Sequence, residues 1–431
     1  MRTQYILVAI LLVGVALGPT ACGPKPLLSG VSFNKDIITP NADGDEDVAL
    51  VTFSLSRSAD ISIYFEDAAG ERFYFRKDVY HGPSVEKPYT VYFAGVVDGY
   101  VLPDEVFEGF AVEKRVLQDG VYTWTLAATD RQGHTARASG TLTIADADTS
   151  LPELRGFSVF PPVITPNRDS ISDRATIVVD LKKDVEELTV YLLGEEDDTR
   201  YFVQESEKAT KFSKAGYHEF DYDAGVDLGA EPPPDGTYTV IMEARDAVGQ
   251  WAKATGEIII QNGGVPRAYI LNAEVEWSGG IEGGGPSVSI PLGGTLYFTL
   301  TVENDSTVPI RTSGPPPGTV YDSDQNYATL GEHQQPGVFR VGIHCETSPI
   351  DHPWRWAVGG PDDLEEVTVG GDTYTYLPAG ERAVVSGGIR FVDMVDARNP
   401  QYCYASLIHE DVQISLVNYR VDAVSVFIEA P

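Results

Sequence analysis

The sequence predicts an all-β protein, built of three tandem β-sandwich domains behind an N-terminal signal peptide. Three observations lead to this prediction. The 431 residues include 42 Gly and 28 Pro, which are frequent in turns. Beyond the N-terminus, short segments alternate apolar and polar residues, and no sustained stretch has helical spacing. One block of sequence also occurs twice, and the length suits about three domains.

Residues 1–21 have the pattern of a signal peptide. An early basic residue precedes an apolar stretch from Tyr5 to Leu17, which is too short to span a membrane. Ala21 followed by Cys22 resembles the processing site of bacterial lipoproteins, although Pro19 replaces the leucine usual in that family. The resemblance implies an exported protein whose lipid-modified Cys22 anchors it to a membrane on the extracytoplasmic side, at the cell surface or outer envelope. Ordinary secretion after cleavage near Ala21 is the alternative.

The first copy of the repeated block is predicted at residues 28–146 and the second at 152–261. The segment Ile38–Asn41, ITPN, returns as Ile164–Asn167. Further anchors follow in the same order in both copies, and the first copy carries extra residues around Glu105–Gln118. A shared order of several anchors indicates duplication of one folding unit.

Each copy contains alternating segments that predict strands with one buried face. In the first copy the predicted inward residues are Phe53, Leu55, Ile61, Ile63, Phe65, Tyr122, Trp124 and Leu126. In the second copy they are Ile177, Val179, Leu188, Val190, Leu192, Tyr238, Val240 and Met242. Rows of this kind, repeated on facing strands, are typical of a small β-sandwich.

An Asp-Gly pair precedes the long strand predicted near the end of each copy, at Asp119-Gly120 and Asp235-Gly236. We expect the glycine to take the positive φ of a tight reversal. The tyrosine two residues later, Tyr122 or Tyr238, is placed to hydrogen-bond across a corner of the sandwich. The later Asp-x-x-Gly motif predicts the turn of the closing hairpin.

Residues 28–261 resemble a known family. The segments ITPNADGDED, DGVYTWTLAATDRQG and PPPDGTYTVIMEARDAVG are similar to the immunoglobulin-like domain of the bacterial flagellar hook-capping scaffold, a module that recurs in secreted surface proteins. The resemblance implies two immunoglobulin-like sandwiches with a scaffolding or display role. It does not imply hook assembly, because nothing else in the chain resembles a hook-capping protein.

Residues 267–431 follow a linker and have a different pattern. Alternating segments at 296–302 and 424–428 flank long polar stretches, which predicts a larger β-sandwich with long loops. Cys345 and Cys403 lie in this part. With Cys22 assigned to lipid they form an even pair, and an oxidising compartment permits a disulfide across 58 positions (403 − 345), worth roughly 4 kcal/mol. Two unpaired buried thiols are the alternative.

The ITPN loops are the candidate metal sites. In the first copy Asn41, Asp43, Asp45 and Asp47 place oxygens at every second position, as calcium ligands can be placed. The second copy keeps Asn167, Asp169 and Asp173 but has Ile171 where the first has Asp45. The same side chains can instead hydrogen-bond to the backbone of a turn that holds no ion. We therefore predict a structural turn and no cofactor, with structural calcium as the alternative.

Function is less well marked than architecture. Asp and Glu number 64 against 31 Lys and Arg, a formal net charge of −33, which disfavours nucleic acid as a partner. We find no catalytic motif and predict no enzyme. The chain reads as a surface lipoprotein for structure, display or adhesion, with an envelope protein or a glycan as partner. The alternative is a carbohydrate-binding accessory protein whose reader is Trp354 and Trp356, unless both rings belong to the core.

Overall fold

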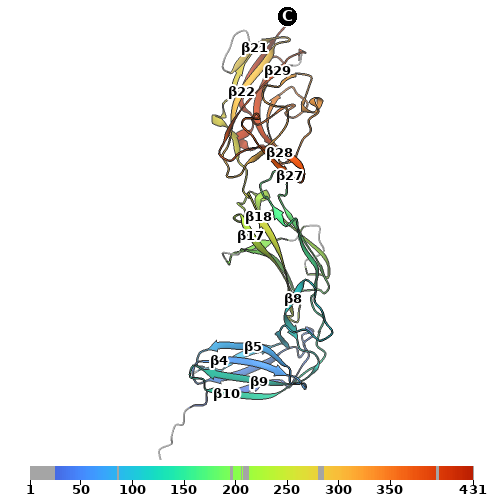
Figure 1. Ribbon diagram of the computed structural model, residues 1–431, viewed down its shortest axis with the longest axis vertical. Coiled ribbons are helices and arrows are strands. Elements are labelled where there is room, and N and C mark those ends of the chain that lie inside the picture. The colour runs from blue at the N-terminus through green and yellow to red at the C-terminus, as the bar shows by residue number, and fades with distance from the viewer. Residues whose placement is uncertain are drawn as a thin grey trace, which may run out of the picture. The chain divides into compact units, whose positions relative to one another are not determined.

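The computed structural model in Figure 1 describes residues 25–84, 87–194, 198–204, 206, 213–279, 286–394 and 398–430. Its regular structure is almost entirely β-strand, which confirms the predicted fold class of tandem β-sandwiches. Among the described residues, no helix has the length and apolar character needed to cross a membrane. The signal peptide and Cys22 lie outside the described residues.

The chain divides into two compact units. The first contains the described residues up to Glu105, together with Val112–Leu151 and Ala247–Trp251. The second contains Val106–Ala111 and Pro152–Asp246, and continues from Ala252 to the C-terminal part. The described residues form three separate hydrophobic cores, one in each copy of the repeat and one in the C-terminal segment.

The first copy of the repeat folds as two facing sheets. One sheet has the order β1-β3-β6, with β1 at Leu28–Phe33, β3 at Ala49–Leu55 and β6 at Tyr89–Phe93. The other has the order β2-β10-β9-β4-β5, formed by Ile37–Ile38, Thr135–Ile144, Gly120–Asp130, Ala59–Glu66 and Arg72–His81. A short hairpin of β7 (Val96–Asp98) and β8 (Phe110–Val116) uses the extra residues of this copy.

The second copy repeats this topology strand for strand. Its smaller sheet has the order β11-β13-β16, formed by Leu154–Phe160, Ala175–Leu181 and Gly216–Tyr222. The sheet facing it contains β15-β14-β17-β18 and β12, formed by Arg200–Val203, Glu187–Gly194, Gly236–Arg245, Trp251–Ile260 and Val163–Ile164. Even the irregularity of the first strand is repeated, because β1 and β11 shift register at Gly30 and Gly156, with φ of 61° and 62°. The duplication is therefore structural as well as sequential.

The inward rows predicted from alternation form the two sandwich cores. Strands β3 and β13 both bury every second residue along their length. Phe53, Ile61, Ile63 and Phe65 have no exposed surface. All other predicted inward residues are buried as well except Leu188, which is partly buried against its core. The period of two in the sequence thus identifies the core of each sandwich.

The predicted tyrosine corner is present in both copies. The Tyr122 hydroxyl donates to the carbonyl oxygen of Gln118 at 2.9 Å, and the Tyr238 hydroxyl donates to that of Pro234 at 2.7 Å. The closing hairpins turn at Gly133 and Gly249, which have φ of 82° and 98°. Both tyrosines tie the start of a long strand to the residues that lead into it.

The role predicted for the two Asp-Gly pairs is wrong. Neither Gly120 nor Gly236 has a positive φ, because each already begins an extended strand, β9 or β17. The aspartates bond instead to the chain that leaves the neighbouring strand at the same end of the sheet. Asp119 accepts two backbone N–H groups just after β10, and Asp235 accepts two just after β18. The pair therefore anchors the departing chain to the start of β9 or β17.

The third segment also packs two sheets over one core. The smaller sheet has the order β19-β22-β29-β24 with β20 beside β22, formed by Ala268–Ile270, Thr295–Asn304, Arg382–Arg390, Val320–Asp322 and Glu276–Ser278. The larger sheet has the order β21-β31-β30-β25-β23-β28-β27, formed by Ser287–Pro291, Val421–Glu429, Gln401–His409, Phe339–Cys345, Ile310–Thr312, Asp372–Leu377 and Glu365–Val369. Strand β26 (Trp354–Ala357) pairs with β25.

The predicted disulfide is present. Cys345 and Cys403 are directly opposite each other on β25 and β30, and their sulfur atoms are bonded. Both residues belong to the core between the two sheets. The bond therefore links two central strands of the larger sheet, over a sequence separation of 58 residues.

Candidate functional site

The Asn41 loop closes on its own aspartate. One oxygen of Asp47 accepts the backbone N–H groups of Asn41 and Ala42 at 3.0 and 2.9 Å, and the other accepts that of Gly44 at 2.7 Å. Positive φ values at Ala42, Gly44 and Glu46 turn the N–H groups inward. Successive N–H groups that converge in this way form a nest for an anion. Here the anion is the loop's own Asp47.

The other candidate ligands of this loop also make turn hydrogen bonds. The side-chain oxygen of Asn41 accepts the N–H of Asp43 at 3.0 Å, and Asp43 accepts that of Asp45 at 2.8 Å. In the described part of the chain, no three His, Cys, Asp or Glu side chains converge as metal ligands. The hydrogen bonds account for the loop's conformation without an ion. Calcium at Asp43 and Asp45 stays a prediction.

The second loop has the same backbone. Asp173 accepts the N–H groups of Asn167 and Ser170 at 3.0 and 2.6 Å. Asn167 accepts the N–H of Asp169 at 3.0 Å, and the residues at positive φ are Arg168, Ser170 and Ser172, in the same alternation. Because Ile171 stands here in place of Asp45, that aspartate is not needed to form the turn.

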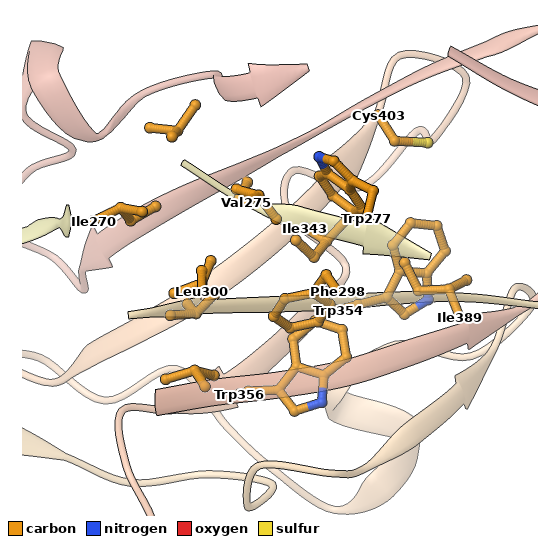
Figure 2. Close-up of a cluster of buried hydrophobic side chains, with 14 of the residues drawn as sticks. Ile270, Val275, Trp277, Phe298, Leu300, Ile343, Trp354, Trp356, Ile389 and Cys403 are labelled. Atoms are coloured by element: carbon orange, nitrogen blue, oxygen red, sulfur yellow. The ribbon is translucent and has the colours of Figure 1, made fainter. Parts of the chain in front are cut away.

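The two tryptophans proposed as a glycan reader lie in the core. Trp354 is 4% exposed and Trp356 is 0% exposed. Figure 2 shows both indoles within the cluster that includes Phe298, whose ring centroid lies 4.7 Å from that of Trp356. A buried ring has no free face for a sugar. These side chains therefore fill the sandwich core, as the core interpretation of the pair expected, and their alternative role as a glycan reader is wrong.

The residue between them points to the other side of the sheet. Because side chains alternate along a strand, Arg355 leaves the core where Trp354 and Trp356 enter it. Its guanidinium donates to a carboxylate oxygen of Glu410 at 2.7 Å, and Arg340 donates to the same oxygen at 3.3 Å. All three side chains are buried, with exposures of 8% for Arg355 and 0% for Glu410 and Arg340.

This ion cluster is held by many further hydrogen bonds. Arg340 donates to the carbonyl oxygens of Ser313 and His333 at 2.7 and 2.9 Å, and the second oxygen of Glu410 accepts the N–H of Gln335 at 2.7 Å. A buried charge is tolerated only when it is paired and hydrogen-bonded in this way. Glu410 therefore serves as a structural ion at the floor of the site.

A groove of about 480 Å³ opens above the cluster. Arg355 and Glu410 lie on its floor, and the ring of Tyr327, which also lines the groove, packs against the Arg355 guanidinium, 4.3 Å from ring centroid to Cζ. Its rim has exposed polar side chains, among them Gln334, Asp351, Asp411 and Gln413. The groove thus combines amides, carboxylates and one aromatic ring.

Two histidines lie beside the groove. His352 has no exposed surface, and its backbone takes a positive φ of 42°. Burial lowers the pKa of His352 to about 4, although the neighbouring Asp351 carboxylate opposes the effect. Burial likewise lowers the pKa of His344. The His352 carbonyl oxygen accepts a hydrogen bond from Arg355 Nε at 3.0 Å, so the backbone at His352 helps to orient the guanidinium.

Sequence reasoning missed Arg340, Arg355 and Glu410. A usable signal existed for Arg355, because a strand that buries two tryptophans at alternate positions must direct the residue between them to the opposite face. No local pattern marks Glu410, which lies 55 residues further along the chain. Only the pairing of β25 with both β26 and β30 brings the three side chains together.

No protein-family model and no curated protein matches this chain. Among solved structures it is similar to a tetra-tandem repeat from the extending region of a large adhesion protein, with 11% identity over 88% of this chain and 80% of that chain, at a TM-score of 0.18. It is also similar to a Ca²⁺-stabilised adhesin with which an Antarctic bacterium binds ice, with 13% identity over 94% of this chain and 74% of that chain, at a TM-score of 0.22. The FN1–FN3 domains of chicken CNTN1 are similar with 9% identity over 93% of this chain and 99% of that chain, at a TM-score of 0.24. TM-scores this low carry no argument about function.

Proposed function

We propose that the protein is a non-catalytic binding protein of the bacterial cell surface, exported and anchored through lipid on Cys22. The signal-peptide pattern, the resemblance of residues 28–261 to surface modules and the tandem sandwiches support this role. In it, the two repeats are spacer modules and the third segment binds the ligand. The observation that carries the proposal is the polar groove above the buried cluster of Arg340, Arg355 and Glu410.

A neutral carbohydrate is the ligand class that fits this groove best. Hydroxyl groups of a sugar can pair with the amides and carboxylates of the rim, and a ring such as that of Tyr327 offers an apolar contact. The exposed carboxylates of Asp351 and Asp411 disfavour an anionic ligand. The Arg355 guanidinium on the floor and the Arg340 guanidinium buried beside it are both already paired with Glu410, so neither is a free anion site.

Binding to a glycan array, followed by titration calorimetry with the strongest glycan, tests this proposal. Tyr327→Ala and Gln334→Ala each remove a groove contact, and we expect each to weaken binding about tenfold. Tyr92→Ala is the matched control, because Tyr92 is a 73% exposed tyrosine on β6 of the first sandwich. Equal binding by all variants would exclude the groove. An array with no bound glycan would reject the carbohydrate ligand.

Substitution of Arg355 or Glu410 is less informative than substitution of the rim. Removing one member of a buried ion pair leaves its partner charged and unpaired, which costs about 3–5 kcal/mol. Such a variant would lose binding through loss of the fold. Gln334 and Tyr327 avoid this problem because Gln334 is exposed and Tyr327 is only half-buried.

A further inference from the structure

The loop 167–173 of the second sandwich, here called the plug, is seated in the third segment. Both belong to the second compact unit. The Asp169 side chain accepts a hydrogen bond from the Tyr376 hydroxyl at 2.8 Å, and Arg311 donates to the Asp169 carbonyl oxygen at 2.9 Å. Asp169 is only 5% exposed. The plug is therefore held through both its side chain and its backbone.

Two further residues complete the socket. The His409 ring donates from Nε2 to the Arg168 carbonyl oxygen at 3.0 Å and stacks on Phe339, with centroids 4.0 Å apart. Gly337 has a φ of 79°, and a Cβ atom built there would lie 2.3 Å from the carbonyl carbon of Asp169. Only glycine permits an approach this close, so the socket is shaped to the plug backbone.

The residues that touch the plug also position the floor of the groove. Gly337 donates its N–H to the Glu410 carbonyl oxygen at 2.9 Å. Glu410 donates its own N–H to the Val338 carbonyl oxygen, also at 2.9 Å. Arg311, which holds the plug backbone, also donates to the Gln335 side chain at 3.0 Å. Gln335 in turn donates its N–H to the Glu410 carboxylate at 2.7 Å.

His409 provides a third connection, since it precedes Glu410 in the chain. It contacts the plug and lines the same groove. The turn that follows is closed by hydrogen bonds from the Val412 and Gln413 N–H groups to the His409 carbonyl oxygen, at 3.1 and 3.0 Å. Glu410 must keep one orientation to pair with two guanidiniums at once, so displacement of its neighbours disturbs the floor.

We propose that the plug regulates the groove: its seating in the socket of Arg311, Gly337, Tyr376 and His409 fixes the segment 409–413 and thereby the pairing of Glu410 with Arg355. The second sandwich is then a control element for the binding segment as well as a spacer. As a statement about ligand binding, the inference rests on the function proposed above. As a statement about structure, it can be tested without a ligand.

Hydrogen–deuterium exchange on the full chain makes that test. Tyr376→Phe removes only the hydroxyl that pairs with Asp169, and Arg311→Ala combined with it removes the backbone contact as well. We expect the plug amides of Asp169 and Ile171 and the groove amides of Glu410, Val412 and Gln413 to exchange about tenfold faster in the double variant. The single variant should show a smaller increase in the same amides.

Asp43→Ala is the matched control. Asp43 occupies the position of Asp169 in the first loop and makes the equivalent turn hydrogen bond. In this control the exchange rates of the amides of 409–413 should equal those of the wild type. Faster exchange in the plug with unchanged exchange at 409–413 would overturn the inference. So would unchanged exchange in the plug itself, because the contacts described would then not hold it.

The exchange experiment tests regulation by the plug and the glycan array tests the ligand, so either proposal can be rejected while the other holds. Coupled exchange with a blank glycan array would keep the mechanical link and reject the proposed ligand. Glycan binding with uncoupled exchange would keep the function and reject regulation by the plug. In the case where both hold, the double variant should bind the array-selected glycan about tenfold more weakly than the wild type, while Asp43→Ala binds equally.

Discussion

The loops at Asn41 and Asn167 have one backbone and two environments. Each closes a nest on its last aspartate, Asp47 or Asp173, with left-handed residues at alternate positions. In the first loop Asp43 is exposed, whereas the equivalent Asp169 is buried against Tyr376. The local sequence is therefore sufficient for the turn, and the environment decides what the turn does.

The difference is visible in the protonation of the carboxylates. Burial alone would raise the pKa of Asp47, but the N–H groups of Gly44, Asn41 and Ala42 hold it below the ordinary value. In the second loop burial raises the pKa of Asp173. Burial, with the charge of Asp173 nearby, also raises the pKa of Asp169 to about 6. Similar hydrogen bonds thus give opposite shifts of the pKa, because the second loop packs against the third segment and its carboxylates are buried there.

The largest effect on stability should come from removing the carboxylates of Asp47 and Asp173, which accept the N–H groups of the two nests. Asp173→Ala leaves the N–H of the buried Asn167 without its acceptor, and we expect it to lower the free energy of unfolding by about 3 kcal/mol. Asp47→Ala exposes the same groups to water and should cost about 1 kcal/mol. Amide exchange of β13 and β3 in the full chain measures the two losses. Equal losses would contradict the comparison.

A smaller effect should follow from neutralising Asp169. A folded-state pKa of about 6, above the ordinary 3.8, means that its contribution is fully present below about pH 4 and is lost as the pH rises through 6. Asp169→Asn removes this loss, so the variant should be more stable than wild type by about 1–3 kcal/mol at pH 8. Near pH 4 the two should be equal.

Chemical denaturation at both pH values checks this prediction. The charged or titratable groups that face Asp169 are Tyr376, Arg311 and Asp173. His409 acts in the opposite direction, because burial lowers its pKa to about 4 and its contribution is lost as the pH falls from about 6.5. That loss is common to wild type and variant and cancels in their difference. A variant less stable than wild type at pH 8 would reject the assignment.

The smallest effect concerns calcium. If Asp43 and Asp45 bind Ca²⁺, a concentration ten times the Kd should stabilise the first sandwich by about 1.4 kcal/mol. Differential scanning calorimetry of the full chain with and without millimolar calcium measures the shift in Tm. The double variant Asp43→Asn, Asp45→Asn should then show no shift. Identical Tm values for wild type with and without calcium would leave the loop as a turn closed by hydrogen bonds.

Sequence reasoning succeeded where the cause is local or periodic. Alternation placed residues such as Phe53 and Ile177 in their cores, and the spacing of Tyr122 and Tyr238 identified two corner hydrogen bonds. It failed for Gly120, because a dipeptide does not reveal whether its aspartate bonds to the next residues or to a strand end 27 residues away. For Trp354 and Trp356 the sequence left core and exposed reader as alternatives, since alternation alone does not tell which face of β26 is covered.

By itself, the sequence determined the strands and the duplication, and it favoured the closed turns at Asn41 and Asn167 and the pairing of Cys345 with Cys403. These depend on period, on short-range hydrogen bonds and on the small number of partners available. Only the tertiary structure decided that Asp169 is buried and that Arg355 meets Glu410. Contacts between residues distant in sequence depend on strand order and on loop packing, and no local pattern encodes the loss of solvent that gives those charges their role.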